Sequence, residues 1–336
     1  MPLASLSAIA TVWIIVLENT NWSQVTGANS PFLTGLLPDF AHALNYKNPP
    51  HLHPSEPNYI WLEAGSNLGM TTDNDPSIGY AVVAGTPHLA SQMNAKGVSW
   101  KTYQENISGT DCPLYSNYPY ASKHNPYIFF NEVTGNQTAT WPECISHMRP
   151  LTELKTDLAN NNVSPYNFIT PNLCNDGHDC PLFDGYNDVD TFLTDYVPAI
   201  VASEAFQSGV LFITWDEGYS SSDGPIGFLV VSPFAKPGYS NSIAYTHSSY
   251  VRTIQDIFEL SPYLNDAANA VNLADLFDTA QPSASPTTRR PTSKAPATHS
   301  PSTAAPLTGS APTRKPTRKP THTKKKNKNK KNKNKG

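Results

Sequence analysis

The chain has 336 residues, of which 38% are hydrophobic, and a formal net charge of −4. That small charge hides two unlike segments, because all 27 acidic residues precede position 281 and only eight of the 23 Lys and Arg residues do. The acidic charge of residues 1–280 disfavours nucleic acid as a partner, and no apolar run approaches the roughly 20 residues that span a bilayer. We expect one large domain at 1–280, followed by a basic tail at 281–336.

Strand-like and helix-like segments alternate along the domain. Strands are predicted at 10–19, 209–218 and 227–238, and helices at 87–97, 150–161, 188–206 and 246–260. In the last helix Ser248 or Ser249 is available as N-cap, and the apolar face consists of Val251, Ile254, Ile257 and Phe258. This order predicts an α/β fold, a three-layer α/β/α sandwich with a mostly parallel central sheet. Residues 110–150, rich in Tyr, Asn and Pro, are expected to form a long loop excursion over the site.

Cysteines and glycosylation sequons indicate a secreted protein, extracellular or bound to the cell wall. Cys174 and Cys180 enclose five residues and could close a tight disulfide loop, which leaves Cys112 and Cys144 as the second pair. The alternative for these cysteines is a zinc site. Sequons begin at Asn21, Asn106, Asn136 and Asn162. The N-terminus runs directly into the first strand, so we expect that an upstream leader is missing from the recorded start.

Two predicted strands end in polar, acid-bearing pairs. Glu18-Asn19 follows the first strand, and Asp216-Glu217 follows "LFITW". Ligands of parallel α/β sheets bind beyond the carboxyl ends of the strands, and acidic groups gathered there repel one another without a cation between them. The pairs therefore predict one divalent metal ion, and their oxygen ligands do not choose among Ca, Mg, Mn, Fe and Zn. The alternative is that these residues form turns and cap helices.

Ser55 is a candidate nucleophile. It lies in "HPSEPNY", where Pro57 restricts the backbone and Asn58 can hydrogen-bond locally, so the hydroxyl is expected on a stiff turn at a helix start. A serine nucleophile needs a base or a metal ion, and no GxSxG elbow is present in the chain. The alternative is an ordinary turn serine.

Several separated motifs together resemble one enzyme family. They are, in order, "LENTNWSQV", "HPSEPNY", "SWKTYQE", "KHNPYIFFNEV", "TPNLCNDGHDC", "FITWDEG" and "THSSYVRTIQDIFEL". Their series is similar to the phosphoesterase family, which groups acid phosphatases with phosphatidylcholine-type phospholipases C inside the alkaline-phosphatase-like superfamily. One departure is Trp22-Ser23, where the family pattern has Phe-Asp; it alters the wall behind the first acidic pair.

The resemblance implies a role for each matching position. Glu18, Asn19, Asp216 and Glu217 would bind the metal ion. Ser55 would be both metal ligand and nucleophile, forming a phosphoserine that water hydrolyses. Asn58, beside the nucleophile, is expected in substrate binding.

Histidines are candidates for proton transfer and phosphate binding, because imidazolium serves both at mildly acidic pH. His178 is the first choice for the general acid, and His124 with Lys123 is expected to bind phosphate. His247, which precedes the last helix, is the third candidate. His51 and His53 flank the nucleophile and are expected to be structural.

The predicted function is that of a phosphoric ester hydrolase: a secreted, metal-dependent acid phosphatase acting on small phosphate monoesters. The alternatives are a phospholipase C-like phosphodiesterase and a non-catalytic cell-wall-associated protein. The tail at 281–336 holds no acidic or aromatic residue and is expected to be disordered. Its "KKKNKNKKNKNKG" end is suited to anionic cell-wall polymers.

Overall fold

A computed structural model describes residues 6–77, 81–178, 185–220 and 224–278, without the side chains of 185–187. The chain divides into two units, Met1–Thr288 and Arg289–Gly336, and every described residue belongs to the first. The predicted tail at 281–336 lies outside the described residues, so the predictions about it stay predictions.

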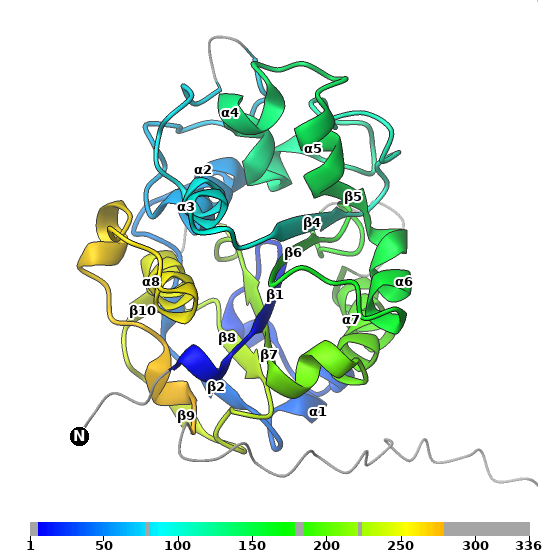
Figure 1. Cartoon of the computed structure of the whole chain (residues 1–336). Coiled ribbons are helices and arrows are strands. Elements are labelled where there is room, and N and C mark those ends of the chain that lie inside the picture. Colours follow the sequence, from blue (N-terminus) through cyan, green and yellow to red (C-terminus); the bar gives the residue numbers. More distant parts are fainter. Residues whose placement is uncertain (1–5, 78–80, 179–184, 221–223, 279–336) are drawn as a thin grey trace, which may run out of the picture. The chain divides into compact units, whose positions relative to one another are not determined.

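A large sheet forms the centre of the described domain (Figure 1). Its strands run in the order β5-β4-β6-β1-β7-β8-β2-β9, and only β8 is antiparallel to its neighbours. The bounds are β1 Thr11–Leu17, β2 Ala41–Ala43, β4 Trp100–Gln104, β5 Met148–Pro150, β6 Tyr166–Thr170, β7 Gly209–Trp215, β8 Phe228–Val231 and β9 Ser240–Asn241. A second, two-stranded sheet pairs β3 Tyr46–Lys47 with β10 Tyr245–Thr246. The predicted mostly parallel sheet is confirmed.

Helices cover the sheet on two sides. Figure 1 shows α2, α3 and α8 on one side and α6 and α7 on the other, which confirms the three-layer sandwich. The bounds are α1 Pro31–Leu36, α2 Ser55–Ala64, α3 Leu89–Lys96, α4 Asn131–Thr134, α5 Pro142–His147, α6 Leu154–Ala159, α7 Gly185–Val201 and α8 His247–Phe258. The N-cap of α8 is Thr246 and not Ser248 or Ser249, because Ser249 Oγ accepts the Thr246 backbone N–H in a capping box. No described helix has the length and apolar character of a membrane span.

The two strands that lead to the predicted site are buried along their whole length. Every residue of β1 and β7 is buried, as expected of apolar, β-branched strands covered on both faces. These strands pair in parallel with Leu17 opposite Trp215. The residue that follows each strand, Glu18 or Asp216, therefore emerges at the same edge of the sheet.

The excursion between β4 and β5 is folded rather than a bare loop. It contains α4, α5 and the 3-10 helix η3 (Ser122–His124), and the predicted Cys112–Cys144 disulfide is confirmed. Cys180 lies outside the described residues, so its predicted pairing with Cys174 stays a prediction. Through η3 the excursion carries Lys123 and His124 to the carboxyl edge of the sheet, as the contacts below establish.

Candidate active site

The two predicted strand ends meet. The backbone N–H of Asn19 donates to Asp216 Oδ1 at 3.2 Å, and Glu18 and Asp216 are both completely buried. This places carboxylates from neighbouring parallel strands side by side in the protein interior, where each unpaired charge is costly. The edge of the sheet is thus a concentrated acidic site.

A third carboxylate and a histidine complete the cluster. His124 Nε2 lies 3.1 Å from Glu18 Oε1, and His124 Nδ1 lies 3.2 Å from Asp176 Oδ2. One potential ligand atom from each of these three buried residues lies within 4.8 Å of the others. Sequence reasoning missed Asp176, because it follows β6 by six residues and not directly; the available signal was its place in "NDGHD", within a motif already noted.

The Ser55 hydroxyl points into this cluster. Ser55 is the first residue of α2, is 1% exposed, and donates to Glu18 Oε2 at 2.9 Å. The predicted helix start is therefore present, and it aligns the positive end of the helix dipole with the hydroxyl. Such a position favours the approach of an anion to Ser55.

Burial and like charge shift the pKa values of the cluster. Burial, followed by the charges of Asp216 and Asp176, raises the pKa of Glu18 well above its usual value. Burial also raises the pKa of Asp176 well above its usual value and that of Asp216 to about 6. The pKa of His124 moves in the opposite direction: burial, and to a smaller extent the charge of Lys123, lower it well below 6.5. In all four groups burial is the largest cause, and it disfavours the charged form.

Unpartnered buried atoms test whether the cluster suits a cation. The buried side-chain atoms without a hydrogen-bond partner include Asn19 Oδ1 and Asp216 Oδ2. Glu18 Oε1, Asp176 Oδ2 and both ring nitrogens of His124 approach one another to 3.1 and 3.2 Å but do not form hydrogen bonds of good geometry. Such atoms are rare in proteins unless something binds them. Carboxylate oxygens with one imidazole form a donor set common to Mn, Fe and Zn, whereas Ca and Mg prefer oxygen alone. The residues present therefore fit one divalent cation.

Two predicted site residues hold each other beside the cluster. Glu217 Oε2 accepts from Asn58 Nδ2 at 2.9 Å and lies 2.8 Å from His53 Nδ1. The Asn58 amide also donates to the carbonyl oxygens of Leu52 and Pro54. These contacts fasten the chain before Ser55 to α2, which gives Asn58 and Glu217 a positioning role; their predicted contacts with substrate and metal stay predictions.

Lys123 and His247 also support the site from its edge. Lys123 Nζ pairs with Asp73 Oδ2 at 2.9 Å. Burial lowers the pKa of Lys123, but the charges of Glu18 and Asp73 outweigh this and raise it overall.

His247 binds Tyr46 Oη at 3.0 Å and the Asp216 carbonyl oxygen at 2.6 Å, and burial lowers its pKa to about 4. With both nitrogens engaged behind Asp216, His247 is placed to hold the β7 end rather than to transfer protons.

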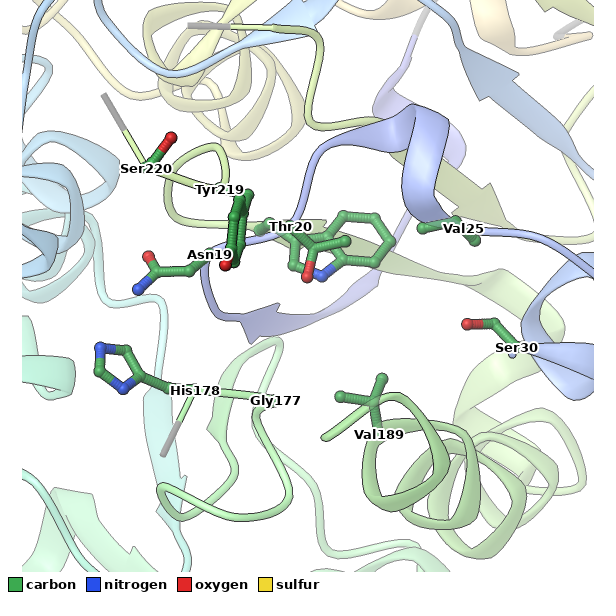
Figure 2. A pocket seen from close by; sticks show the side chains of 10 residues that line it. Asn19, Thr20, Val25, Ser30, Gly177, His178, Val189, Tyr219 and Ser220 are labelled. Carbon is green, nitrogen blue, oxygen red and sulfur yellow. The ribbon is translucent and has the colours of Figure 1, made fainter. Parts of the chain in front are cut away.

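His178 lies where the cluster meets open space. Its backbone N–H donates to Asp176 Oδ1 at 2.8 Å, and its ring lies 6.2 Å from that of His124. His178 and Asn19 both line a cavity of about 440 Å³, and Figure 2 shows their side chains at the same side of it. The exposed His178 ring therefore faces the space from which a substrate would approach.

Three of the four sequon asparagines are exposed. These are Asn106, Asn136 and Asn162, as glycosylation would require. Asn21 differs, because its Oδ1 is buried and its backbone N–H is bonded to Gln24. Glycosylation at the exposed three stays a prediction.

Comparison with characterised proteins gives related acid and lipid phosphatases. The chain is 32% identical over 60% of its length to "Phosphate-repressible acid phosphatase" of Penicillium chrysogenum, and spans about half (48%) of that protein. It is 27% identical over 82% of its length to "Phosphatidylinositol-3-phosphatase" of Mycobacterium tuberculosis, of which it covers 85%.

Solved structures support the fold. A phosphonate monoester hydrolase from Silicibacter pomeroyi matches with a TM-score of 0.52 at 12% identity, over 82% of this chain and 78% of that one. A Vibrio parahaemolyticus protein of the alkaline phosphatase superfamily matches with a TM-score of 0.50 at 9% identity, over 76% and 67%. The sequence profile of the phosphoesterase family matches residues 44–261, which is more than half of the chain. The chain belongs to the phosphoesterase family.

Proposed function

We propose that the protein is a metal-dependent phosphatase that hydrolyses phosphate monoesters through a phosphoserine at Ser55. The observation that carries this proposal is the buried hydrogen bond from Ser55 Oγ to Glu18 Oε2, inside a cluster with Asp176, Asp216 and His124. Family membership and the acid phosphatase relatives support the same reaction.

In the first step Ser55 Oγ attacks phosphorus and the bond to the leaving oxygen breaks. The Ser55 proton passes to Glu18 Oε2, the acceptor of its hydrogen bond, and the leaving oxygen takes a proton from His178. Lys123 and the start of α2 contribute positive potential toward the entering phosphate. In the second step water gives a proton to the now neutral His178 and attacks phosphorus, the bond from phosphorus to Ser55 Oγ breaks, and Glu18 returns the proton to Ser55 as phosphate leaves.

Glu18, Asp176, Asp216 and His124 would hold the divalent cation, and Asn19 supplies a further unpartnered buried oxygen. When bound, such an ion neutralises the carboxylates and stabilises charge on the phosphoryl oxygens. This set keeps the predicted Glu18, Asn19 and Asp216, adds Asp176 and His124, and does not include the predicted ligands Ser55 and Glu217.

His178 is the proposed general acid. It is exposed on the wall of the cavity next to the cluster, where an imidazolium could give its proton to the leaving oxygen. Secretion is part of the same proposal, supported by the Cys112–Cys144 disulfide and the exposed sequons. Attachment of the tail to anionic cell-wall material is proposed from its basic sequence alone.

The test compares Ser55→Ala with a matched control. Ser232 is also buried and donates to the Gly209 carbonyl oxygen at 2.7 Å, so Ser232→Ala removes a similar hydrogen bond away from the cluster. Turnover of p-nitrophenyl phosphate should fall by about 10³-fold or more in Ser55→Ala, as for loss of other nucleophiles, and stay near wild type in Ser232→Ala. Equal activity of Ser55→Ala and wild type would remove Ser55 from this role.

Two further substrates separate the proposal from its alternatives. Wild-type protein saturated with metal is assayed on bis(p-nitrophenyl) phosphate and on phosphatidylcholine. A kcat/KM higher on either diester than on the monoester would favour a phospholipase C-like enzyme. Hydrolysis of none of the three would favour a non-catalytic role.

A further inference from the structure

The cavity beside the cluster has two chemically different sides. Figure 2 shows Asn19, His178 and Ser220 toward one side and Val25, Ser30 and Val189 toward the other. Its volume of about 440 Å³ is within the range of small-molecule sites. Because Asn19 follows the proposed ligand Glu18 directly, the polar side adjoins the reacting phosphate and the rest of the cavity is left for the ester's leaving group.

The cavity offers no partner for a second anionic group. Among its described lining residues, His178 is the one basic side chain, and the proposed mechanism uses it at the leaving oxygen. Among the described lining residues, an anionic leaving group would therefore find no further basic side chain to compensate its charge.

Aromatic and aliphatic side chains form the rest of the wall. Trp215, Tyr219, Val25 and Val189 all line the cavity. The Trp215 ring is packed edge-on by Trp22, with ring centroids 6.1 Å apart. Trp22 is the residue at which the chain departs from the family pattern, so this wall is a property of this sequence. Packed aromatic and apolar surfaces favour a ring-sized, uncharged group.

We propose that this cavity is a leaving-group pocket that selects phosphate monoesters with an uncharged, apolar, ring-sized leaving group, and that it discriminates against leaving groups that carry a second anion. The inference rests on the proposed function, which supplies the phosphate side of the site. It sets this protein apart from a phosphatase for phosphoinositides or other multiply phosphorylated substrates.

The experiment uses the full chain, saturated with metal, and two aryl esters whose leaving phenols have closely similar acidity. These are 1-naphthyl phosphate, which is uncharged in its leaving group, and 4-carboxyphenyl phosphate, which is anionic there. Because the two leaving phenols are similarly acidic, the ratio of the two kcat/KM values measures how the pocket discriminates between the leaving groups. We expect 1-naphthyl phosphate to be preferred about tenfold or more, the effect of burying one unpaired charge.

Variants tie that ratio to the pocket. Tyr219 is 59% exposed and lines the cavity, so Tyr219→Lys adds a cation there and should reduce the preference up to about fivefold, as expected for a partly exposed ion pair. The matched control is Val271→Lys, at a residue 58% exposed that does not line the cavity, and its ratio should equal that of wild type. Val189→Thr keeps the volume of the wall but adds a hydroxyl, and should lower kcat/KM for the naphthyl ester more than for the carboxyphenyl ester.

The outcomes separate the two levels of the proposal. Hydrolysis of both esters with equal kcat/KM, or a preference that Tyr219→Lys and Val271→Lys change alike, would overturn the pocket and leave monoester hydrolysis standing. Hydrolysis of neither ester would overturn both. A preference for the carboxyphenyl ester would also overturn the pocket, because it would mean that the leaving-group side favours an anion.

Discussion

Substituting Asp176 by Asn should have opposite effects on stability with and without metal. Asn keeps the size of the side chain, and its Oδ1 can still accept the His178 backbone N–H. In the metal-free protein the change removes one of three buried carboxylates that repel one another. In the metal-loaded protein it removes a proposed ligand.

The magnitude follows from the separation of the ligand atoms. Two unit charges 4.8 Å apart repel by about 3 kcal/mol at an effective dielectric constant near 20. Part of this is already relieved by protonation, because burial raises the pKa of Glu18 and of Asp176. A gain of about 1 to 3 kcal/mol, or roughly 2 to 10 °C in Tm for a domain of this size, is expected in EDTA at neutral pH.

The assay is thermal unfolding in EDTA and in excess metal, using whichever of Ca, Mg, Mn, Fe or Zn raises the wild-type Tm most. In excess metal the wild type should have the higher Tm, because metal binding stabilises its folded state by RT ln(1 + [L]/Kd) and the variant binds the metal more weakly. Asp157→Asn is the matched control: Asp157 accepts from Lys101 and Tyr103, so its loss should destabilise equally in both conditions. The same sign of effect for Asp176→Asn in both conditions would refute the shared cation.

Three further predictions concern stability and the tail. Burial lowers the pKa of His88, but hydrogen bonds to two glutamates outweigh burial and raise this pKa above 6.5. The stability that protonated His88 contributes is therefore complete below pH 6.5 and is lost as the pH rises through the raised pKa. His88→Gln should therefore lower Tm more at about pH 5.5 than at about pH 8.5, and an equal loss at both would contradict this. Gly65→Ala should destabilise the domain by more than about 1 kcal/mol in urea unfolding. The reason is that Gly65 has φ +68° and an added Cβ would lie 2.7 Å from the Leu264 carbonyl oxygen. An unchanged midpoint of urea unfolding would be inconsistent with this contact. Truncation after Ala280 should leave hydrolysis of p-nitrophenyl phosphate intact and abolish salt-sensitive retention on anionic cell-wall polymer, whereas equal retention of both forms would remove the tail from this role.

The sequence predicted what depends on short stretches. Apolar strands ending in Glu18 and Asp216 indicated one shared sheet edge, because parallel strands present their carboxyl ends together, and Ser55 was expected at a helix start. The pairing of Asp176 with His124 was not predictable in this way. Each lies on a separate connection, and their proximity depends on how the excursion after β4 folds back. Glu217 was expected at the metal because it adjoins Asp216; its Oε2 contacts Asn58 and His53, an arrangement that depends on tertiary packing and that no short stretch of sequence indicates.

The most direct measurement is to locate the phosphate covalently bound during turnover. Metal-loaded protein is mixed with p-nitrophenyl phosphate, quenched in acid within one turnover, digested and examined by mass spectrometry, with Ser55→Ala treated in parallel. A phosphorylated peptide containing Ser55 in the wild type, absent from the variant, is the predicted result. Phosphate on a histidine, which acid would remove, is tested by an alkaline quench. Phosphorylation of His124 or His178, or a burst of p-nitrophenol with Ser55 unmodified, would contradict a serine nucleophile at this cluster.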